Sequence, residues 1–507
     1  MNLGDWTTQW SETDPDEPCL KYGDLVLTKF EFNCRVNQTA NAFLDLGIRK
    51  GDRVAVLMAN TNVYLEILFA MAKIGGILVA LNFRLSPDEL DFIINNAEPE
   101  AMVYSPEFLP TIDALRDKLP TVKSYFCEME GGAAGDPLFE SWIADKSEQE
   151  PDCGEEIVIE DALFIMYTSG TTGLPKGAVI SQENALFNAI NLVMSVTATK
   201  SDTNVICAPL FHVAALTISA LPQLYTGALA VIQRSFDPVE FLKLVEENKA
   251  TWAMGVPVMW QFVAAMPEFQ TTDLSSLRLL ASGGSITPKS LIETFQEKGI
   301  PIATGFGMTE TAGAASSLTA ENCVEKMGSS GKPLFHTRIK IVDMNGNPVE
   351  RGEIGEILMK GPNIMKEYWR MPEATAETII DGWLHSGDIG YLDENSFLYV
   401  KDRKKDMYKS GGENVYPAQI EEVIFAMPGV NDVAIIGIPD EKWQEVGLAL
   451  VAKGPDAALS EEEVISYCRE NLAGYKCPKK VIFVDQLPRT LTGKLLKKDL
   501  RAQYGGA

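Results

Sequence analysis

The segment Tyr167 to Gly177, YTSGTTGLPKG, lies between two apolar runs, Ala162 to Met166 and Gly177 to Ile180. Apolar runs of this length beside glycine-rich residues are typical of buried strands, so we expect a loop that joins two strands. Glycines let backbone N–H groups approach an anion closely. Hydroxyl side chains can donate to phosphate oxygens or bind Mg²⁺, and Lys176 adds a positive charge. The segment therefore predicts a polyphosphate-binding loop in a fold with buried strands.

The spacing of this loop differs from that of the common nucleotide-binding loop, G-x-x-x-x-G-K-[ST]. Counted from Gly170, the second glycine would fall on Pro175, and counted from Gly173 it would fall on Ala178. A surface turn of glycine and threonine is the alternative interpretation, and the length of the whole string argues against it. The loop therefore predicts a nucleotide site of another class.

Apolar runs alternate with amphipathic helical stretches through most of the chain. Arg53 to Leu57 and Ile77 to Leu81 have the pattern of strands, on either side of a helix from Val63 to Lys73. The same order recurs, and repeated strand–helix–strand units argue for parallel sheets covered by helices. Further strands are expected at Leu229 to Ile232, Thr251 to Val256, Leu277 to Ala281 and Pro301 to Thr304, with helices at Pro238 to Asn248 and Pro288 to Lys298.

The pattern changes twice toward the C-terminus. From about residue 335 to 399, short strands joined by Asn-Gly and Arg-Gly turns are typical of a small β-barrel. The charged segment KDRKKDMYKSGG then leads into a compact α+β pattern. The expected fold class is α/β. A large N-terminal domain (1–400) of helix-covered sheets with the small β-barrel would be joined at 401–403 to a small α+β C-terminal domain (404–507).

The chain carries a net charge of −26, from 44 basic and 70 acidic residues among 507. Such a surface repels nucleic acids and anionic membranes, so neither is an expected partner. The acidic N-terminus does not resemble a signal peptide. The most apolar stretch, Tyr64 to Leu81, contains Glu66 and Lys73, so a buried helix and strand are expected there and not a transmembrane segment.

The cysteines and histidines also restrict the functional class. The 8 cysteines include no C-x-x-C pair, which indicates free thiols in the reducing cytosol. The 3 histidines form no Cys/His cluster, which argues against a structural transition-metal site. We therefore expect a cytoplasmic protein. A homodimer is left open.

Two more glycine-containing loops follow expected strands. GFGMTET, from Gly305 to Thr311, comes after the strand Pro301 to Thr304, and such loops are where parallel sheets bind ligands. Glu310 offers a hard oxygen for Mg²⁺ and Phe306 a flat face for a base. A simple turn is the alternative. The loop ASGGSITP, with Gly283 and Gly284, could let adenine or an acyl group lie against bare backbone.

Single polar residues add to these loops. His212, in the apolar segment APLFHVAAL, is either a core histidine or a gate beside a carboxylate. Asp388, in HSGDIGYLD, either caps a turn or accepts both hydroxyls of a ribose, to which Arg403 could also donate. Lys494 lies where a loop turns into a helix, so it could be directed toward an anion.

Together the strings YTSGTTGLPKG, GFGMTET, HSGDIGYLD, KDRKKDMYKSGGENVYPAQIEE and TGKLLKKDLR resemble, in order, the signatures of the adenylate-forming superfamily. This superfamily comprises acyl- and aryl-CoA synthetases, luciferases and peptide-synthetase adenylation modules, and the resemblance runs from about Asp24 to Arg501. It implies that a carboxylate attacks the α-phosphate of Mg-ATP to give acyl-AMP and pyrophosphate, after which the thiol of coenzyme A takes the acyl group. Such chemistry needs positioned charges more than a protein nucleophile. The implied cofactors are ATP, Mg²⁺ and coenzyme A as cosubstrate.

The resemblance implies a role for each motif. Glu310 would bind Mg²⁺ together with Thr171, and Phe306 would stack near adenine. The residues expected to be catalytic are Lys494, Thr171, Glu310 and His212. Those expected at ATP or AMP are Thr168, Ser169, Gly170, Thr172, Gly173, Lys176, Gly283, Gly284, Gly305, Phe306, Gly307, Met308, Thr309, Asp388 and Arg403.

The resemblance also implies movement of the C-terminal domain. Asp402 matches the hinge position of the family, and rotation there would let Lys494 bridge the carboxylate and the phosphate in the first step. In the second step the segment Ser410 to Pro417 would replace Lys494 and line a tunnel for the CoA arm. The residues expected at CoA are Lys409, Gly411, Gly412, Asn414 and Trp443.

Two positions depart from the family pattern. Phe306 stands where tyrosine is more common, so a hydroxyl is lost while the stacking face is kept. Gln444 follows Trp443 where glycine is frequent, which changes the expected CoA contact.

The nature of the acid depends on the expected acyl pocket. No carrier-protein sequence follows Lys494, which favours a stand-alone CoA ligase of the bacterial fatty-acyl and aryl type. We expect a medium- or long-chain fatty acid, and hence a role in lipid metabolism. An aryl-CoA ligase for benzoate- or cinnamate-type acids is the alternative of the same class, and a non-catalytic sensor of acyl-AMP or ATP is that of a different class. The expected pocket residues, which are mostly small or apolar, are His212, Val213, Met254, Gly283 and Gly305.

Overall fold

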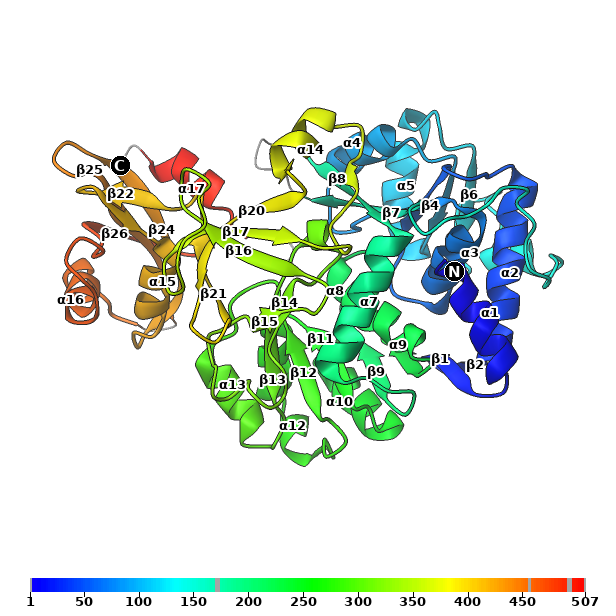
Figure 1. The fold of residues 1–507 in the computed structure, drawn as a ribbon, viewed down its shortest axis with the longest axis horizontal. Helices are drawn as coiled ribbons and strands as arrows, with labels where there is room; N and C mark the ends of the chain where they lie inside the picture. Colours follow the sequence, from blue (N-terminus) through cyan, green and yellow to red (C-terminus); the bar gives the residue numbers. More distant parts are fainter. Residues whose placement is uncertain (1, 169–173, 455–456, 490–494, 506–507) are drawn as a thin grey trace. The chain divides into compact units, whose positions relative to one another are not determined.

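The computed structural model describes residues 2–168, 174–454, 457–489 and 495–505. The chain divides into two compact units, whose elements are labelled in Figure 1. The first unit comprises Met1–Ile339 and Met359–Leu384, and the second comprises Lys340–Leu358 and His385–Ala507. The predicted hinge at 401–403 lies inside the second unit, and the division at that hinge stays a prediction.

A seven-stranded sheet of the first unit contains both strands that flank the predicted phosphate loop. Its order is β18-β8-β7-β4-β3-β5-β6, and the strands from β7 to β6 are parallel, whereas β8 and β18 are antiparallel to their neighbours. The parallel strands are almost wholly apolar because helices cover them. The strands are β3 (Arg53–Leu57), β4 (Ile77–Ala80), β5 (Ala101–Tyr104), β6 (Ser124–Cys127), β7 (Ala162–Thr168), β8 (Lys176–Ser181) and β18 (Glu367–Tyr368).

A nine-stranded sheet of the same unit contains the other two predicted loops. Its order is β15-β14-β13-β12-β11-β9-β10-β1-β2, and the strands from β13 to β1 are parallel. Both of these loops leave the carboxyl ends of parallel strands, where such sheets bind ligands. The strands are β1 (Pro18–Tyr22), β2 (Leu25–Thr28), β9 (Thr203–Ile206), β10 (Leu229–Ile232), β11 (Trp252–Gly255), β12 (Leu279–Ser282), β13 (Ile302–Phe306), β14 (Ser316–Ser317) and β15 (Lys332–Pro333).

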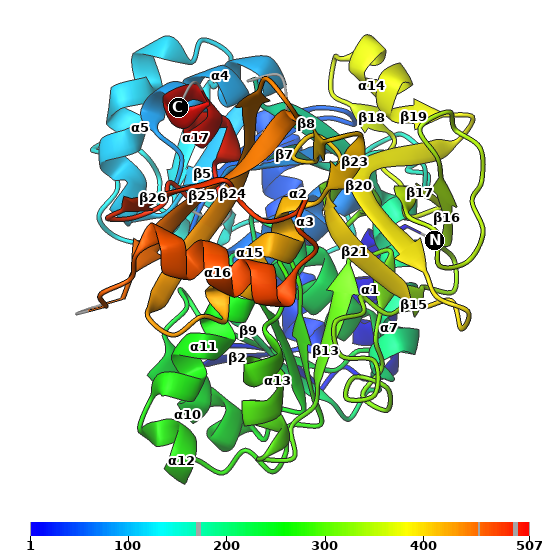
Figure 2. The ribbon, with the colours of Figure 1, turned by 90° about the vertical axis from the view of Figure 1, so that its left-hand side faces the viewer.

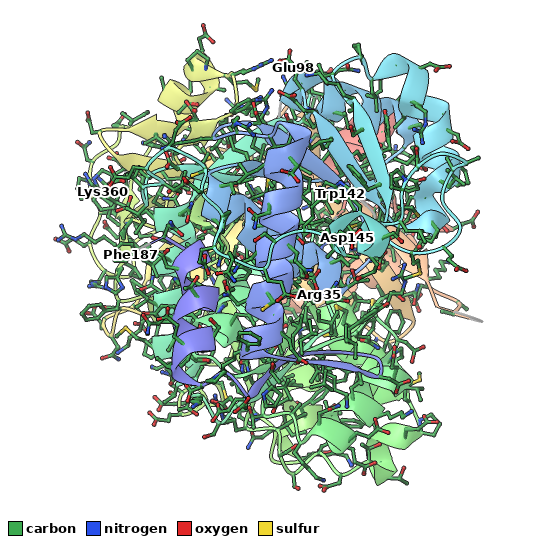
Figure 3. The ribbon with its side chains drawn as sticks, turned by 90° about the vertical axis from the view of Figure 1, so that its right-hand side faces the viewer. Arg35, Glu98, Trp142, Asp145, Phe187 and Lys360 are labelled. Atoms are coloured by element: carbon green, nitrogen blue, oxygen red, sulfur yellow. The ribbon has the colours of Figure 1, made fainter. Side chains whose placement is uncertain are left out.

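Helix α3 (Asn62–Ile74) packs against strands of both sheets, and every one of its residues is buried. An apolar helix of this kind is typical of a core helix, so the expected buried helix and strand between Tyr64 and Leu81 are confirmed. Its charged residue Glu66 is paired with Arg35 of α2 (Lys29–Leu46), with Arg35 Nε 2.7 Å from Glu66 Oε1. Arg35 is labelled in Figure 3.

Some helices of the first unit begin at recognisable sequence signals. Thr28 and Glu31 form a capping box at the start of α2, and Ser181 and Asn184 form one at the start of α7. Helices α4 and α5 share one core with β3 to β6. The helices are α1 (Gly4–Thr13), α4 (Pro87–Ala97), α5 (Leu109–Leu115), α6 (Phe139–Ile143), α7 (Gln182–Val196), α8 (Val213–Ala215), α9 (Leu221–Tyr225), α10 (Pro238–Asn248), α11 (Pro257–Ala265), α12 (Glu268–Thr271), α13 (Lys289–Gln296) and α14 (Pro372–Thr378), with one-turn or irregular helices η1 (Pro106–Phe108), η2 (Arg116–Lys118), η3 (Leu216–Ala220) and η4 (Thr309–Thr311).

The segment predicted as a small β-barrel forms a five-stranded sheet of order β16-β17-β20-β19, with β21 beside β20. Strands β20 and β21 are antiparallel, and their pairing runs from Asp388 opposite Arg403 to Leu392 opposite Leu398. The strands are β16 (Arg338–Val342), β17 (Gly355–Lys360), β19 (Ile379–Ile380), β20 (Trp383–Leu392) and β21 (Leu398–Arg403).

The C-terminal residues fold as a second five-stranded sheet with helices on both faces (Figure 2). Helices α15 and α16 share one core with β24 and β25, and α17 shares another core with the opposite face of these strands. The expected α+β pattern is thus present. The elements are β22 (Tyr408–Ser410), β23 (Glu413–Val415), β24 (Val430–Asp440), β25 (Gln444–Lys453), β26 (Lys480–Val484), α15 (Pro417–Phe425), α16 (Glu461–Asn471) and α17 (Lys497–Tyr504).

Two expectations about the whole chain can be compared with the structure. All 8 cysteines are free thiols, as expected. Within the described part of the chain, every helix is too short or too polar to cross a membrane.

Candidate functional site

Strands β7 and β8 close the base of the predicted phosphate loop. Their antiparallel pairing extends to Thr168 and Lys176, which lie opposite each other, and the Thr168 hydroxyl donates to the Lys176 carbonyl at 3.4 Å. A Cβ atom at Gly177 would lie 3.0 Å from Cζ of Tyr167, so a side chain there would push against the ring. The two expected strands that flank the loop are confirmed. The predicted phosphate-loop residues Ser169, Gly170, Thr171, Thr172 and Gly173 lie outside the described residues.

Lys176 and Glu310 meet at one aromatic side chain, Tyr368 of β18. Nζ of Lys176 lies 5.1 Å from the centre of the Tyr368 ring, within the range of a cation–π contact. The Tyr368 hydroxyl donates to Oε1 of Glu310 at 2.7 Å, and both side chains are buried. The structure therefore brings the predicted phosphate lysine and the predicted Mg²⁺ ligand to the same side chain.

Glu310 fits a Mg²⁺ ion that is shared with substrate phosphates. Within the described ranges, no group of three or more histidine, cysteine, aspartate or glutamate side chains could hold a metal ion by itself. Mg²⁺ commonly uses one or two carboxylates together with phosphate oxygens and water, and does not need a cage made only of protein. One carboxylate near the lysine of a phosphate loop is such a donor set.

Glu310 lies in a tight turn that follows β13 and that two glycines make possible. A Cβ atom at Gly305 would lie 2.9 Å from a backbone oxygen of β14, and a Cβ atom at Gly307 would clash with the returning backbone. The Met308 N–H donates to the Thr311 hydroxyl at 3.0 Å, which fixes the turn. Phe306 and Thr309, which are also predicted to lie at the nucleotide, belong to the same segment.

Three predicted acyl-pocket residues lie side by side at the ends of β11, β12 and β13. A Cβ atom at Gly283 would lie 3.2 Å from Cε of Met254 and 4.0 Å from the carbonyl oxygen of Gly305. Gly284, which follows, has a φ of 82°, in the left-handed region that favours glycine. These residues form one continuous wall.

His212 and Val213 lie next to the turn of Glu310. His212 caps helix α8, and its Nδ1 accepts a hydrogen bond from the Ala214 N–H at 3.2 Å, so a neutral imidazole carries its proton on Nε2. Val213 is buried, and its carbonyl accepts from the Thr217 hydroxyl at 2.9 Å. A Cβ atom at Gly313, just after the turn, would lie 2.7 Å from that hydroxyl. The histidine segment and the turn therefore pack together.

In the second unit, the two residues that are predicted to bind ribose form an ion pair with each other. Asp388 and Arg403 are opposite each other on β20 and β21, and Arg403 Nε lies 2.8 Å from Asp388 Oδ1. The Asp388 carboxylate is buried, and its backbone N–H donates to the Ser386 hydroxyl at 3.0 Å. The pair forms a fixed donor and acceptor set of the kind that ribose hydroxyls can join.

The predicted CoA residues also gather in one place. Lys409 lies opposite Asn414 on the hairpin of β22 and β23, and Gly411 and Gly412 form its turn with φ of 62° and 88°. The Gly411 N–H donates to the Trp443 carbonyl at 2.9 Å, and a Cβ atom at Gly411 would lie 2.7 Å from the indole ring. Glycine is thus required beside Trp443.

Gln444, which departs from the family pattern, has an unusual backbone conformation. Gln444 has a φ of 69°, in the left-handed region that most side chains avoid. The sequence places a non-glycine residue where the backbone favours glycine.

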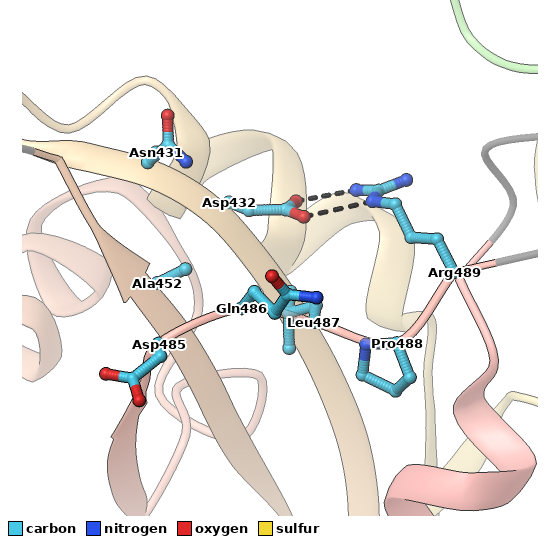
Figure 4. A pocket seen from close by; sticks show the side chains of 8 residues that line it. All are labelled: Asn431, Asp432, Ala452, Asp485, Gln486, Leu487, Pro488 and Arg489. Carbon is cyan, nitrogen blue, oxygen red and sulfur yellow. Dashed lines mark hydrogen bonds and ion pairs between the residues drawn. The ribbon is translucent and has the colours of Figure 1, made fainter.

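Lys494 lies outside the described residues, whereas Arg489 and Leu495, on either side of its segment, are described. Arg489 and Leu495 form an antiparallel bridge. The guanidinium of Arg489 pairs with the Asp432 carboxylate through two contacts, of 3.0 and 2.6 Å, beside a hollow of about 480 Å³ (Figure 4). This ion pair ties the base of the Lys494 segment to β24.

Asp402, the predicted hinge residue, is held at the start of helix α15. Its carboxylate accepts from the Arg403 N–H at 2.7 Å and from the Ala418 N–H at 2.8 Å. Burial raises the pKa of Asp402, and the nearby Lys497 acts in the opposite direction. Lys497 itself pairs with the partly buried Glu421 at 2.7 Å, which ties α17 to α15. The predicted hinge thus lies in a cluster of charged groups.

Sequence reasoning missed Tyr368 and the Arg489–Asp432 pair. Tyr368 lies 58 positions from Glu310, and Arg489 lies 57 positions from Asp432. The segment KEYW around Tyr368 carries no glycine-rich signal. The arginine just before the Lys494 segment was a signal that could have been followed.

Comparisons with known proteins identify the family of this chain. The family model for the AMP-binding enzyme matches residues 7–369, and that for the AMP-binding enzyme C-terminal domain matches residues 419–494. A feruloyl-CoA synthase from Amycolatopsis sp is 39% identical over 505 residues, which cover 100% of this chain and 99% of that protein. The long-chain-fatty-acid–CoA ligase FadD13 of Mycobacterium tuberculosis is 38% identical over 486 residues, or 95% of this chain and 94% of that protein.

A solved structure agrees with the sequence relatives. The crystal structure of the anthranilate CoA ligase AuaEII in complex with anthranoyl-AMP superposes with a TM-score of 0.90 at 28% identity, and the match covers 99% of this chain and 97% of that one. The chain therefore belongs to the AMP-binding enzyme family, and it is an acid–thiol ligase of the AMP-forming acyl- and aryl-CoA type.

Proposed function

We propose that this ligase activates a compact aromatic carboxylic acid as its acyl-AMP and transfers the acyl group to coenzyme A, with release of AMP and pyrophosphate. The alternative substrate, a medium- or long-chain fatty acid, is kept as the second candidate. The observation that carries the proposal is a buried layer of side chains, here called the floor. It lies beyond the wall formed by the predicted acyl-pocket residues.

The floor is a buried layer of hydrogen-bonded side chains. Trp252 lies two positions before Met254 on β11, so both point to the same face of the sheet. The Trp252 indole donates to Gln223 Oε1 at 3.0 Å, and the Ser219 hydroxyl donates to Asn204 Oδ1 at 2.7 Å. All four of these polar or aromatic side chains are buried. An alkyl chain that extended past Met254 along this face would have to displace them and leave polar groups unpaired.

The layer above the floor consists mainly of residues with small side chains. Ala281 lies beside Met254 and beside Ala303 on adjacent strands, and Gly283 and Gly305 follow two positions later. Small side chains in two successive layers leave width for a ring, while the floor limits length. Two of the three proteins compared above are also named for aromatic acids, which supports the same substrate class.

The remaining parts of the site have distinct roles in this proposal. Lys176 binds the phosphates of ATP, and Glu310 binds the Mg²⁺ ion that ATP carries. Asp388 and Arg403 bind the ribose, and Lys494 bridges the acid and the α-phosphate. The residues Lys409 to Asn414, with Trp443, form the CoA contact. A homodimer stays a prediction.

The fatty-acid alternative has its own support. FadD13, a protein named for long-chain fatty acids, is 38% identical over 486 residues. The same small residues, Gly283 and Gly305, would also admit an alkyl chain near the reacting carboxylate.

The experiment is CoA-dependent AMP release with benzoate- and cinnamate-type acids and with saturated fatty acids of short, medium and long chain. We expect kcat/KM for the best aromatic acid to exceed that for long-chain acids by more than about 100-fold, since the floor excludes the longer chain. Comparable turnover of long-chain acids would overturn the aromatic proposal in favour of the fatty-acid alternative. Absence of pyrophosphate exchange with every acid would instead contradict the catalytic role itself.

A pair of tryptophan variants tests the floor directly. Trp252→Leu should open space below Met254 and raise the relative turnover of longer acids. Trp260→Leu is the matched control, because Trp260 is also fully buried but packs against Gly255 on the opposite face of β11. Thermal unfolding of both variants separates pocket effects from instability. An equal change of preference in both variants would contradict the floor.

A further inference from the structure

Tyr368 is the one described side chain for which the structure records contacts to both Lys176 and Glu310. Its hydroxyl donates to Glu310 Oε1 at 2.7 Å, and its ring centre lies 5.1 Å from Lys176 Nζ. These two contacts use different parts of the residue, because the hydrogen bond needs the hydroxyl and the cation–π contact needs only the ring.

Backbone pairing fixes the position of Tyr368. Strand β18 adds to β8 with Tyr368 opposite Ala178, two positions after Lys176. The Met365 N–H, just before β18, donates to the Glu310 carbonyl at 2.8 Å. Residues 365–368 therefore connect the return strand of the phosphate loop to the turn that carries Glu310.

The surroundings of Tyr368 keep its hydroxyl a donor. The hydroxyl donates its hydrogen to Oε1 of Glu310 at 2.7 Å. This hydrogen bond restrains the orientation of the carboxylate that would bind Mg²⁺.

We propose that Tyr368 is a positioning residue that orients Glu310 toward Mg²⁺ and holds Lys176 toward the phosphates, so that one side chain couples the metal contact to the pyrophosphate contact. The proposal rests on ATP-dependent ligase activity and is independent of which acid is used. Residues that hydrogen-bond a metal-binding carboxylate fix its orientation, and their loss weakens metal binding although they do not touch the ion.

Two substitutions separate the contacts. Tyr368→Phe keeps the ring and removes the hydrogen bond to Glu310, whereas Tyr368→Leu removes both. The first measurement is ATP binding by titration calorimetry, without any acid, in the presence of Mg²⁺ and in the presence of EDTA. The second is the Mg²⁺ concentration that gives half-maximal pyrophosphate exchange.

We expect Tyr368→Phe to raise the half-maximal Mg²⁺ concentration by about tenfold or more and to leave metal-free ATP binding unchanged. Tyr368→Leu should add a loss of about fivefold in metal-free ATP binding, since Lys176 loses its aromatic neighbour. Unchanged Mg²⁺ dependence in Tyr368→Phe would overturn the metal part of the proposal. Equal metal-free binding by Tyr368→Phe and Tyr368→Leu would overturn the lysine part.

Two controls show whether the effect passes through Glu310. Tyr104→Phe removes another tyrosine–carboxylate hydrogen bond of the same unit, to Asp136 Oδ2 at 2.8 Å, and should leave Mg²⁺ dependence unchanged. In a Glu310→Gln background, Tyr368→Phe should have little further effect, because the carboxylate that it orients is already absent. Additive losses in the double variant would mean that Tyr368 acts by another route. Because calorimetry uses no acid, failure of the aromatic-substrate proposal would leave the calorimetric results unchanged.

Discussion

At the scale of single residues, the site depends on glycines that could not be replaced by any other residue without movement of a neighbour. Gly411 combines a φ of 62° with a position 2.7 Å from the Trp443 ring for an added Cβ atom. Gly305 and Gly307 are restricted instead by neighbouring backbone, that of β14 at Gly305 and that of residues 313–314 at Gly307. Glycine is therefore required for different physical reasons at the two places. In the predicted CoA contact the reasons are φ and a neighbouring side chain, and in the turn of Glu310 the reason is neighbouring backbone.

Gly411→Ala should slow thioester formation by about tenfold or more and leave pyrophosphate exchange close to normal. A methyl group at this position must displace Trp443 or strain the hairpin turn, at a cost of about 1–2 kcal/mol. The measurement is the rate of acyl-CoA formation from supplied acyl-AMP, beside exchange with ATP. Gly474→Ala is the control, since a Cβ atom there would meet nothing within 4 Å. Loss of both half-reactions in Gly411→Ala would contradict a local CoA role.

A buried carboxylate away from the site gives a prediction for pH dependence. Burial would raise the pKa of Asp202, but hydrogen bonds and charge from Arg278 and the Thr251 hydroxyl offset burial and lower it. A lowered pKa in the folded state means that the stabilisation is complete above the unfolded pKa near 3.8 and is lost as pH falls through the folded value. Arg278 binds this carboxylate with both Nε and Nη2 at 3.0 Å.

Asp202→Asn should therefore lower the free energy of unfolding by about 2 kcal/mol at neutral pH. The difference from the parent protein should shrink as pH is lowered below about 4. Urea unfolding at a series of pH values measures both effects. Asp45→Asn, in an exposed pair with Lys146, serves as the control and should change stability by less than about 1 kcal/mol. A difference that grows in acid would show that the sign is wrong.

At the scale of elements, the sequence could predict the loops that follow the ends of strands. The loops after β7, β12 and β13 were predictable because apolar runs of strand length end at glycine-rich segments. Tyr368 was not, because β18 is only two residues long and joins β8 through a pairing between distant parts of the chain. The floor under the acyl wall was equally hidden, since Trp252 and Gln223 meet across 29 positions. Local pattern indicated where ligands bind, whereas tertiary packing decided which side chains orient the binding groups.

Arg489 gives a prediction about the contacts on either side of residues 490–494. Its ion pair with Asp432, together with the bridge to Leu495 and the bond from the Leu496 N–H to the Pro488 carbonyl at 2.9 Å, fixes the base of the segment that carries Lys494. Arg489→Ala should lower pyrophosphate exchange by about tenfold or more, because a small displacement of a catalytic group is costly. Thioester formation from supplied acyl-AMP should change little if Lys494 serves the first step, as proposed.

Charge exchange tests whether the pair itself is responsible. Arg489→Asp combined with Asp432→Arg should restore part of the exchange that either single change removes. Arg469→Ala, at an exposed position of α16, is the control for loss of a positive charge in the same unit. Equal loss of both half-reactions in Arg489→Ala would indicate general disruption of the C-terminal sheet, and the positioning role would fail.

At the scale of the whole molecule, the net charge of −26 contrasts with substrates that are themselves anions. ATP and CoA must therefore be attracted by local groups, and the predicted ones come from both units: Lys176 from the first, and Arg403, Lys409 and Lys494 from the second. A reaction with two chemical steps can use these groups in turn, because a charge that is needed for ATP can hinder the approach of CoA. The hinge predicted at Asp402 is the means by which the chain would exchange them.

Asp402 has two properties that a substitution can separate. Its carboxylate caps α15 at the Ala418 N–H, and its backbone would have to change φ if the C-terminal residues rotate. Asp402→Ala removes only the carboxylate, whereas Asp402→Pro also fixes φ near −65°. If rotation occurs at this residue, Asp402→Pro should slow thioester formation by about tenfold relative to Asp402→Ala, with adenylation less affected. Single-turnover assays of the two half-reactions measure the ratio. Equal rates for the two variants in thioester formation would place the rotation elsewhere in the chain, and equal loss of both half-reactions in Asp402→Pro would argue against two working positions of the C-terminal domain.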